Sequence, residues 1–186
     1  PSGSGKTTLM KLMLNFYEPS EGAIRVGDVN MKQLDEQGWR KQCAWISSEG
    51  YVFQDTIARN IALGDDVIDQ QKLLAVVKAV NLQHFIENLE LGYQTMLGED
   101  GLGLSQGQMQ RLFIARALYK NPDYLFFDEA TTSLDTFNEM LLMENVFDMV
   151  RGKTVVIITH QLPLVRYADH ILVLHEGELV EQGTHK

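Results

Sequence analysis

Apolar residues recur at helical spacing in several stretches of the chain. Over residues 6–16 the apolar positions follow the three- and four-residue steps of an α-helix, and Pro19 with Gly22 then ends the pattern. The same spacing predicts further helices over 55–63, 70–80, 82–89, 106–119 and 136–150.

Three short apolar runs predict buried strands: CAWIS at 43–47, YLFFD at 124–128 and TVVIIT at 154–159. Strands that read as continuous apolar runs and alternate with helices are typical of a parallel sheet covered on both faces. The stretch 22–31 reads as a short strand and turn, and 170–183 as two strands joined by a tight turn. The pattern therefore predicts an α/β fold.

Composition narrows the class of protein. With 186 residues, 45% of them hydrophobic, the chain can bury one sizeable core, so we expect one domain. A net charge of −9 argues against nucleic acid as a partner. The single cysteine, Cys43, cannot form an internal disulfide and reads as a small core residue. No apolar run approaches the ~20 residues that cross a bilayer, so we expect any membrane role to be carried by a segment or subunit outside this sequence.

The first eight residues, PSGSGKTT, match a phosphate-binding loop that leads into a helix. Glycines let successive backbone amides turn inward around phosphate oxygens, and the helix N-terminus adds partial positive charge. The lysine would contact the β- and γ-phosphates of a nucleotide, and the threonine after it would offer a hydroxyl to Mg²⁺. The alternative is a glycine- and serine-rich turn that caps an ordinary helix. The candidate nucleotide-binding residues are Ser2, Gly3, Ser4, Gly5, Lys6, Thr7 and Thr8.

Two acids end the strand at 124–128. Asp128 and Glu129 would lie at the carboxyl edge of the sheet, where open α/β sheets bind ligands. Asp128 can hold Mg²⁺ through its water shell, and Glu129 can orient or deprotonate an attacking water. The alternative is a solvated pair that caps the next turn. His160 ends the next strand; alone it would more often be a structural histidine, but its place beside the acids favours a role in the site.

A second helix start, LSQGQ, precedes the helix at 106–119. Ser105 and Gly107 would form another anion-binding helix end. Because one nucleotide cannot readily engage two such ends in one compact monomer, we expect the serine–glycine end of one copy to cover the terminal phosphate held by a second copy.

LSQGQ followed by QRLFIARAL resembles the signature segment of the ATP-binding cassette family. The motifs GSGKTT, LSQGQ, YLFFDEA, TTSLD and IITH follow in that family's order over essentially the whole chain. The resemblance implies a P-loop ATPase fold, in which a RecA-like, mostly parallel sheet is flanked by helices. It also implies one ATP-binding domain over 1–186, with a helical signature subdomain at about 55–115.

The resemblance implies a role for each matched position. ATP phosphates and Mg²⁺ would be held by the loop residues through Lys6, Thr7 and Thr8, with Asp128 as the magnesium acid and Glu129 as the catalytic carboxylate. The remaining roles fall to His160 as the switch histidine on the γ-phosphate, Asp135 as the link between the two sites, and Ser105, Gly107 and Gln108 as the signature over the partner's nucleotide.

Further details resemble the exporter branch, which hydrolyses ATP to move a substrate across a membrane. The implied partners are a second copy or a paired domain, and a transmembrane domain in the same longer chain or a separate subunit; the implied location is the cytoplasmic face of the cell membrane. Gly98 and Glu99 would contact the transmembrane helices. Within that branch, the sequence most resembles bacterial peptide or bacteriocin exporters, including those fused to a peptidase.

The sequence departs from the family pattern in three places. Ser48 stands where a glutamine usually binds Mg²⁺ and relays its state, so we expect a weakened metal and coupling site. Gln106 replaces a glycine of the signature, with a modest expected effect. The family's N-terminal strands would lie before Pro1, so we expect this sequence to be a piece of a longer one, shortened at both ends.

Two other functions stay open. A regulatory, degenerate cassette would bind nucleotide with little turnover, which Ser48 favours and the intact Lys6, Asp128, Glu129 and His160 oppose. A cassette ATPase without a transport role would carry long coiled-coil insertions or basic arms, and this sequence shows neither.

Overall fold

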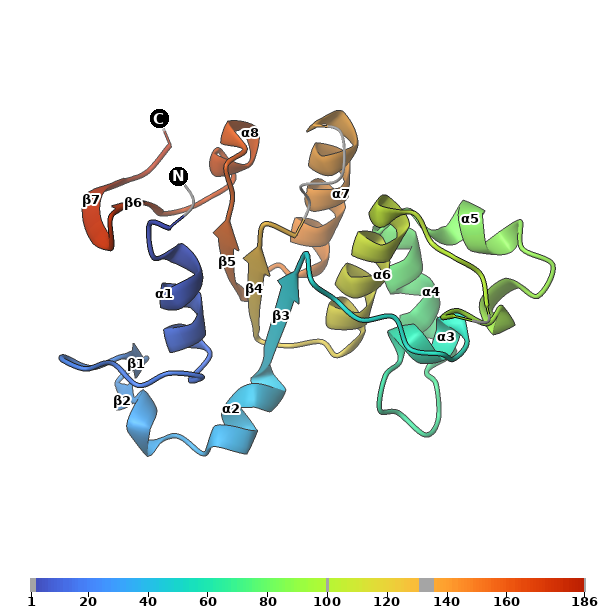
Figure 1. Ribbon diagram of the computed structural model, residues 1–186, viewed down its shortest axis with the longest axis horizontal. Coiled ribbons are helices and arrows are strands. Elements are labelled where there is room, and N and C mark those ends of the chain that lie inside the picture. The colour runs from blue at the N-terminus through green and yellow to red at the C-terminus, as the bar shows by residue number, and fades with distance from the viewer. Residues whose placement is uncertain (1–2, 100, 131–135, 186) are drawn as a thin grey trace.

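The computed structural model of this protein describes residues 3–99, 101–130 and 136–185. Helices separate the strands of the central sheet along the chain, with α3 to α6 between β3 and β4 and α7 between β4 and β5 (Figure 1). The helices are α1 (Lys6–Met13), α2 (Glu36–Gln42), α3 (Ile57–Ile61), α4 (Gln70–Ala79), α5 (Gln83–Glu87), α6 (Gln106–Tyr119), α7 (Thr136–Met149) and α8 (Leu162–Val165), with short 3-10 turns η1 (Met31–Gln33) and η2 (Gly92–Gln94). The strands are β1 (Arg25–Val26), β2 (Val29–Asn30), β3 (Cys43–Ser47), β4 (Tyr124–Asp128), β5 (Thr154–Ile158), β6 (Ile171–His175) and β7 (Glu178–Gly183).

The central sheet has the order β3-β4-β5, with all three strands parallel. Its register places Ser47 of β3 and Ile158 of β5 on either side of Asp128, the last residue of β4. The carboxyl ends of the three strands therefore meet at one edge, as the sequence predicted for the acid-tipped strand.

Alternation along these strands divides their side chains between two hydrophobic cores. Leu125 and Phe127 of β4 lie in the larger core, with Ala44 and Ile46 of β3 and apolar residues of α3, α4, α6 and α7. Phe126 lies in the smaller core, which packs against α1 and contains Met10, Leu14, Met31, Trp39 and Ile158. Because side chains alternate with period two, Asp128 points to the same side as Phe126, toward α1.

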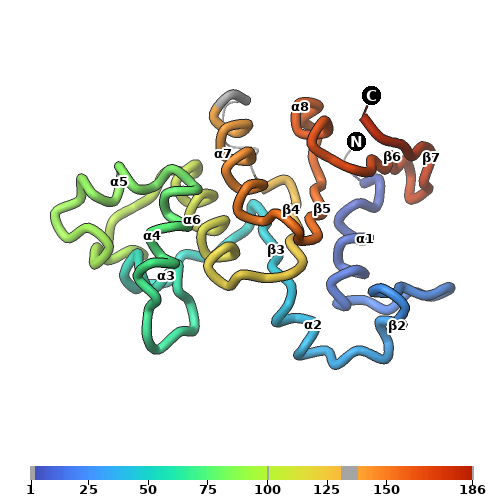
Figure 2. The backbone as a smooth tube through the Cα atoms, turned by 180° about the vertical axis from the view of Figure 1, so that it is seen from behind, coloured from blue at the N-terminus to red at the C-terminus, as the bar shows by residue number. Residues whose placement is uncertain are grey.

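Two antiparallel hairpins flank the sheet. β1 pairs with β2 beyond the C-terminal end of α1, and β6 pairs with β7 near its N-terminal end (Figure 1). Seen from behind, α1 and these hairpins lie on one side of the molecule, whereas α3 to α6 gather on the other (Figure 2). Within the described ranges, no helix combines the length and the apolar character needed to span a membrane.

The structure confirms the predicted α/β class and the three predicted strands. Only β4 is largely buried, whereas Trp45 of β3 is exposed and β5 is mostly half-buried. Some helix boundaries differ: α1 ends at Met13 rather than Phe16, and α3 covers only Ile57–Ile61 of the predicted 55–63. In α7 the buried apolar residues are Leu142, Met143 and Val146, followed by Val150 directly after the helix, whereas Met140 and Phe147 are half-buried. The sequence patterns did not predict α2 or α8, which are seven and four residues long.

Candidate functional site

The loop before α1 has the backbone conformation that the sequence predicted. Gly3 and Gly5 have φ values of 91° and 88°, a region that glycine adopts without strain. Gly5 caps α1, so the amides of its first turn, which lack partners within a helix, face the loop. The Nζ of Lys6 donates a hydrogen bond to the Oγ of Ser4 at 2.6 Å. A glycine loop with this backbone, a lysine and a helix N-terminus is suited to binding phosphate oxygens.

The β6–β7 hairpin supports this loop from behind. The amide of Gly177, in the hairpin turn, donates a hydrogen bond to the carbonyl oxygen of Ser4 at 3.2 Å. The loop and the hairpin turn approach so closely that a Cβ on Gly5 would lie 3.4 Å from the Cα of Gly177. No local pattern predicts this contact, because it joins segments about 170 residues apart.

Thr7 and Asp128 meet where α1 packs against the sheet. The Oγ1 of Thr7, on the first turn of α1, donates to the Oδ1 of Asp128 at 3.4 Å. This pair joins the phosphate-binding loop to the carboxyl edge of β4. A hydroxyl and a carboxylate oxygen are ligands that Mg²⁺ prefers, together with waters and phosphate oxygens. The two side chains therefore fit a magnesium ion between them and a bound nucleotide.

Glu129 and His160 form the second pair at this edge. The Nε2 of His160 lies 2.9 Å from the Oε1 of Glu129, and both side chains are partly exposed, at 52% and 41%. Glu129 has a φ of 50°, in the left-handed region, and its amide donates to the carbonyl oxygen of Ile158 at 3.1 Å. This turn ends the strand's alternation, so the carboxylates of Asp128 and Glu129 both stay at the sheet edge.

The signature segment forms a capped helix start. The Oγ of Ser105 accepts a hydrogen bond from the amide of Gln108, and the Oε1 of Gln108 accepts one from the amide of Ser105. This capping box fixes the first turn of α6 with Gln106 in place. The modest effect expected of Gln106 stays a prediction. Gly107 is half-buried in the same turn.

The two helix starts lie at the same edge of the molecule but on opposite sides of the central sheet. Both views show α1 and α6 apart, with strands between them, and both helices begin toward the edge where β3, β4 and β5 end (Figures 1 and 2). The phosphate-binding loop and Ser105 of one copy are therefore not brought together within that copy.

The remaining predicted site residues have varied placements. Thr8 is exposed on α1. Ser48 is exposed directly after β3, and Ser47, which the sequence reasoning did not select, is the residue level with Asp128 in the parallel register. Ser2 and Asp135 lie outside the described residues.

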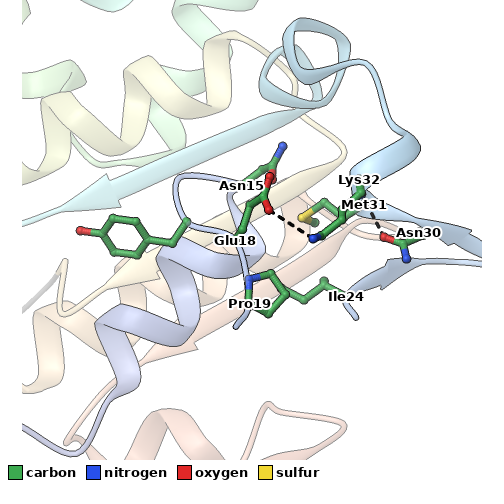
Figure 3. A pocket seen from close by; sticks show the side chains of 8 residues that line it. Asn15, Glu18, Pro19, Ile24, Asn30, Met31 and Lys32 are labelled. Carbon is green, nitrogen blue, oxygen red and sulfur yellow. Dashed lines mark hydrogen bonds and ion pairs between the residues drawn. The ribbon is translucent and has the colours of Figure 1, made fainter. Parts of the chain in front are cut away.

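A small hollow at the C-terminal end of α1 is lined by residues other than those of the candidate site. It is lined by polar and apolar residues of 15–19 and 24–32, with an ion pair of 3.2 Å between Lys32 and Glu18 (Figure 3). It contains none of the predicted site residues and lies near β1 and β2 rather than at the carboxyl edge of the sheet. The candidate site is therefore the edge formed by α1, β4 and β5.

The family assignment comes from comparison with known proteins. A family model described as ABC transporter matches residues 1–132. This chain belongs to the ABC transporter family. Its similarity to ABC proteins extends over the full length: the ATP-dependent lipid A-core flippase of Haemophilus ducreyi is 41% identical over 186 residues, covering 100% of this chain and 32% of that protein. The Toxin RTX-I translocation ATP-binding protein of Actinobacillus pleuropneumoniae is 42% identical over 185 residues, covering 100% of this chain and 26% of that protein.

A solved structure of a bacterial Atm1-family ABC exporter with ATP bound is similar in fold. It superposes with a TM-score of 0.91 at 39% identity, covering 100% of this chain and 32% of that one. The predicted P-loop ATPase fold is thereby confirmed, and the chain is an ABC nucleotide-binding domain of the exporter type. The chain spans a third or less of the length of these relatives.

Proposed function

We propose that this domain is the ATP-hydrolysing motor of an exporter and that it works as a head-to-tail pair with two MgATP between the copies. The observation that most supports this is the meeting of two polar pairs at one sheet edge, Thr7 with Asp128 and Glu129 with His160. They lie beside a glycine loop of the shape that phosphate requires.

The chemistry proposed is attack of a water on the terminal phosphate. The Glu129 carboxylate accepts a hydrogen bond from this water and takes its proton as the new P–O bond forms. The bond to the bridging oxygen breaks, and the electron pair leaves with ADP. Lys6 turns from Ser4 to the phosphates, and His160 moves from Glu129 to the terminal phosphate. Mg²⁺, held by Thr7 and Asp128, would neutralise charge on the phosphate oxygens.

The position of α6 supports the head-to-tail pair. Ser105 and its helix start lie at the same edge as the phosphate-binding loop but across the sheet. A second copy turned by a half rotation sets each Ser105 end over the other copy's nucleotide. Asp135 would link the two sites in this pair.

We further propose a transmembrane domain as partner, with Gly98 and Glu99 at the contact, and hence a place at the cytoplasmic face of the cell membrane. The names of the relatives include a lipid A-core flippase and a toxin translocation protein, so their cargoes differ although their domains are similar to this one. A peptide cargo is our proposal for this chain. The helical subdomain at about 55–115 would form the part that approaches the membrane domain.

The test compares Glu129→Gln with wild type in the full-length protein. We expect hydrolysis of ATP to fall by about 10²- to 10³-fold in Glu129→Gln, because the general base is removed, while ATP binding is retained. Glu144→Gln is a matched control, since Glu144 is an exposed acid of α7 that pairs with Tyr167. It should hydrolyse ATP at the wild-type rate.

A regulatory domain with little turnover is the second candidate, favoured by Ser48 in place of the usual glutamine. It predicts that wild type binds ATP but hydrolyses it no faster than Glu129→Gln. That result would contradict the motor proposal and support the regulatory one.

A further inference from the structure

Arg116 joins α6 to the segment that follows β3. Its side chain lies on the third turn of α6 and donates three hydrogen bonds away from that helix. Nε donates to the carbonyl oxygen of Asn60 at 2.7 Å, Nη1 to that of Tyr51 at 2.9 Å, and Nη2 to the Oδ1 of Asn60 at 3.1 Å. One guanidinium therefore holds both the segment 50–56 and the end of α3.

Asn60 completes this connection. It is fully buried, and its Nδ2 lies within hydrogen-bond distance of the carbonyl oxygens of Phe53, Asp55 and Thr56, at 2.9 to 3.2 Å. Its Oδ1 accepts from the amide of Phe53 as well as from Arg116. The backbone of 53–56 is thus tied to a side chain that Arg116 itself holds.

Aromatic packing adds to these bonds. The Arg116 guanidinium lies 5.3 Å from the Phe53 ring centre and 5.4 Å from that of Phe113, also on α6. Gly50 approaches Phe113 so closely that a Cβ there would lie 2.3 to 2.5 Å from ring atoms. The outer end of the segment is Tyr51, which is 69% exposed and packs edge-on against Phe53.

Arginine suits this place better than lysine would. Its planar guanidinium offers five donors in a fixed fork, whereas lysine offers one compact charge. Burial lowers the pKa of the Arg116 guanidinium, yet an arginine stays charged in proteins, so its hydrogen bonds remain charge-assisted. The contacts to two backbone carbonyls and one amide oxygen draw on all three nitrogens of that fork.

We infer that Arg116 is a positioning residue that makes the exposed Tyr51–Phe53 segment move with the Ser105 end of α6. This inference rests on the proposed function, in which nucleotide engages Ser105 across the dimer. Arg116 lies 11 residues after Ser105, about 16 Å along a rigid helix. A shift of the capped end therefore reaches the segment through the Arg116 hydrogen bonds, beside the packing of Phe113 on Gly50, and Tyr51 presents it at the surface.

The experiment measures amide hydrogen exchange in the full-length protein, with and without MgATP, in the Glu129→Gln background. We expect nucleotide to slow exchange about five- to tenfold both at 103–110 and at 51–56. In Arg116→Lys the change at 103–110 should remain and the change at 51–56 should disappear. Arg111→Lys is the matched control, because Arg111 lies on the same helix but donates to the carbonyl oxygen of Val80; it should keep both changes.

The outcomes separate this inference from the function on which it depends. If 51–56 responds to nucleotide equally in Arg116→Lys and wild type, Arg116 does not position the segment. If nucleotide changes nothing at 3–9 or 103–110 in the unsubstituted background, it is the proposed function that fails.

A second variant covers the case in which Arg116→Lys unfolds. Phe53→Leu removes one stacking partner at a partly exposed position and leaves Asn60 intact. It should reduce the response of 51–56 by about half and leave 103–110 unchanged, in line with a cation–π contact between partly exposed groups. An unreduced response in Phe53→Leu would count against the inference.

Discussion

At the scale of single residues, the site depends on how the backbone aims neighbouring side chains. Asp128 faces α1 because it continues the alternation of Tyr124 and Phe126. Glu129 would face the opposite core if the strand continued, but its left-handed conformation turns the carboxylate to His160. Two adjacent acids thus serve two different partners at one edge.

Ser48 gives the first prediction at this scale. We expect Ser48→Gln to raise the apparent affinity for Mg²⁺ in ATP hydrolysis, by up to about tenfold, because a longer amide can reach the metal's ligand shell. The measurement is the ATPase rate against Mg²⁺ concentration. Ser20→Gln, at another exposed serine, should behave as wild type. If the ATPase rate depends on Mg²⁺ concentration in the same way in Ser48→Gln and wild type, the serine does not weaken the metal site.

Cys43 gives the second prediction at the residue scale. Burial raises the pKa of its thiol to about 12, so the reactive thiolate is scarce at neutral pH. We expect a maleimide at pH 8 to label it at least about 100-fold more slowly in the folded protein than in the unfolded one. Because the folded pKa is raised, the thiol's contribution to stability is fully present below pH 9 and is lost as pH rises toward 12. Rapid labelling of the native protein would contradict this.

At the scale of elements, boundaries follow local capping. α2, α3 and α4 begin after Asp35, Thr56 and Asp69, and each of these side chains accepts a hydrogen bond from an amide of its helix. α6 has the complete capping box. These caps position the helices that pack against β3 and β4, and through them the edge that carries the acids.

The sequence predicted the buried strands, the long helices and the paired acids because each has a local signature. It did not predict α2, since seven residues with the single buried residue Trp39 show no helical period. It did not select Arg116 or Asn60, because their roles depend on contacts between residues 56 positions apart. Long-range polar contacts leave no period in the chain, so only the fold reveals them.

The segment 95–98 gives the element-scale prediction. It packs on 54–57, with the amide of Leu97 donating to the carbonyl oxygen of Asp55. A Cβ on Gly98 would lie 2.9 Å from the Cα of Gln54, so Gly98→Ala should reduce the free energy of unfolding by about 1–3 kcal/mol more than Gly64→Ala. Gly64 has a similar φ, 92° against 105°, and open space around it. A denaturant titration measures both, and equal losses would mean that the segment shifts freely.

At the scale of the whole molecule, the phosphate-binding loop and the capped end of α6 occupy one edge but stand apart (Figure 1). In the head-to-tail pair that we propose, a single copy thus carries one half of each of two sites. The C-terminal ends of α1 and α6 lie toward the opposite edge, which keeps that side clear of the nucleotide in the pair we propose.

The whole-molecule prediction concerns the closing of this pair. A spin label on Arg151→Cys, an exposed position after α7, should report shorter distances between copies when MgATP is added to Glu129→Gln. Ser105→Glu should weaken this closure about 100-fold, because a carboxylate at the helix start repels the phosphate. Ser20→Glu adds the same charge elsewhere and should close normally. If Ser105→Glu closes at the same ATP concentrations as the protein without this substitution, the head-to-tail arrangement is excluded.

The left-handed backbone at Glu129 has a consequence for the evolution of the domain. A residue with a Cβ is strained there, by about 1 kcal/mol or more, and glycine would relieve that strain. Glu129→Gly should therefore make the protein harder to unfold while depriving it of turnover. Under the catalytic role that we propose for Glu129, selection for stability alone would favour an inactive protein, and only selection for hydrolysis would keep the carboxylate.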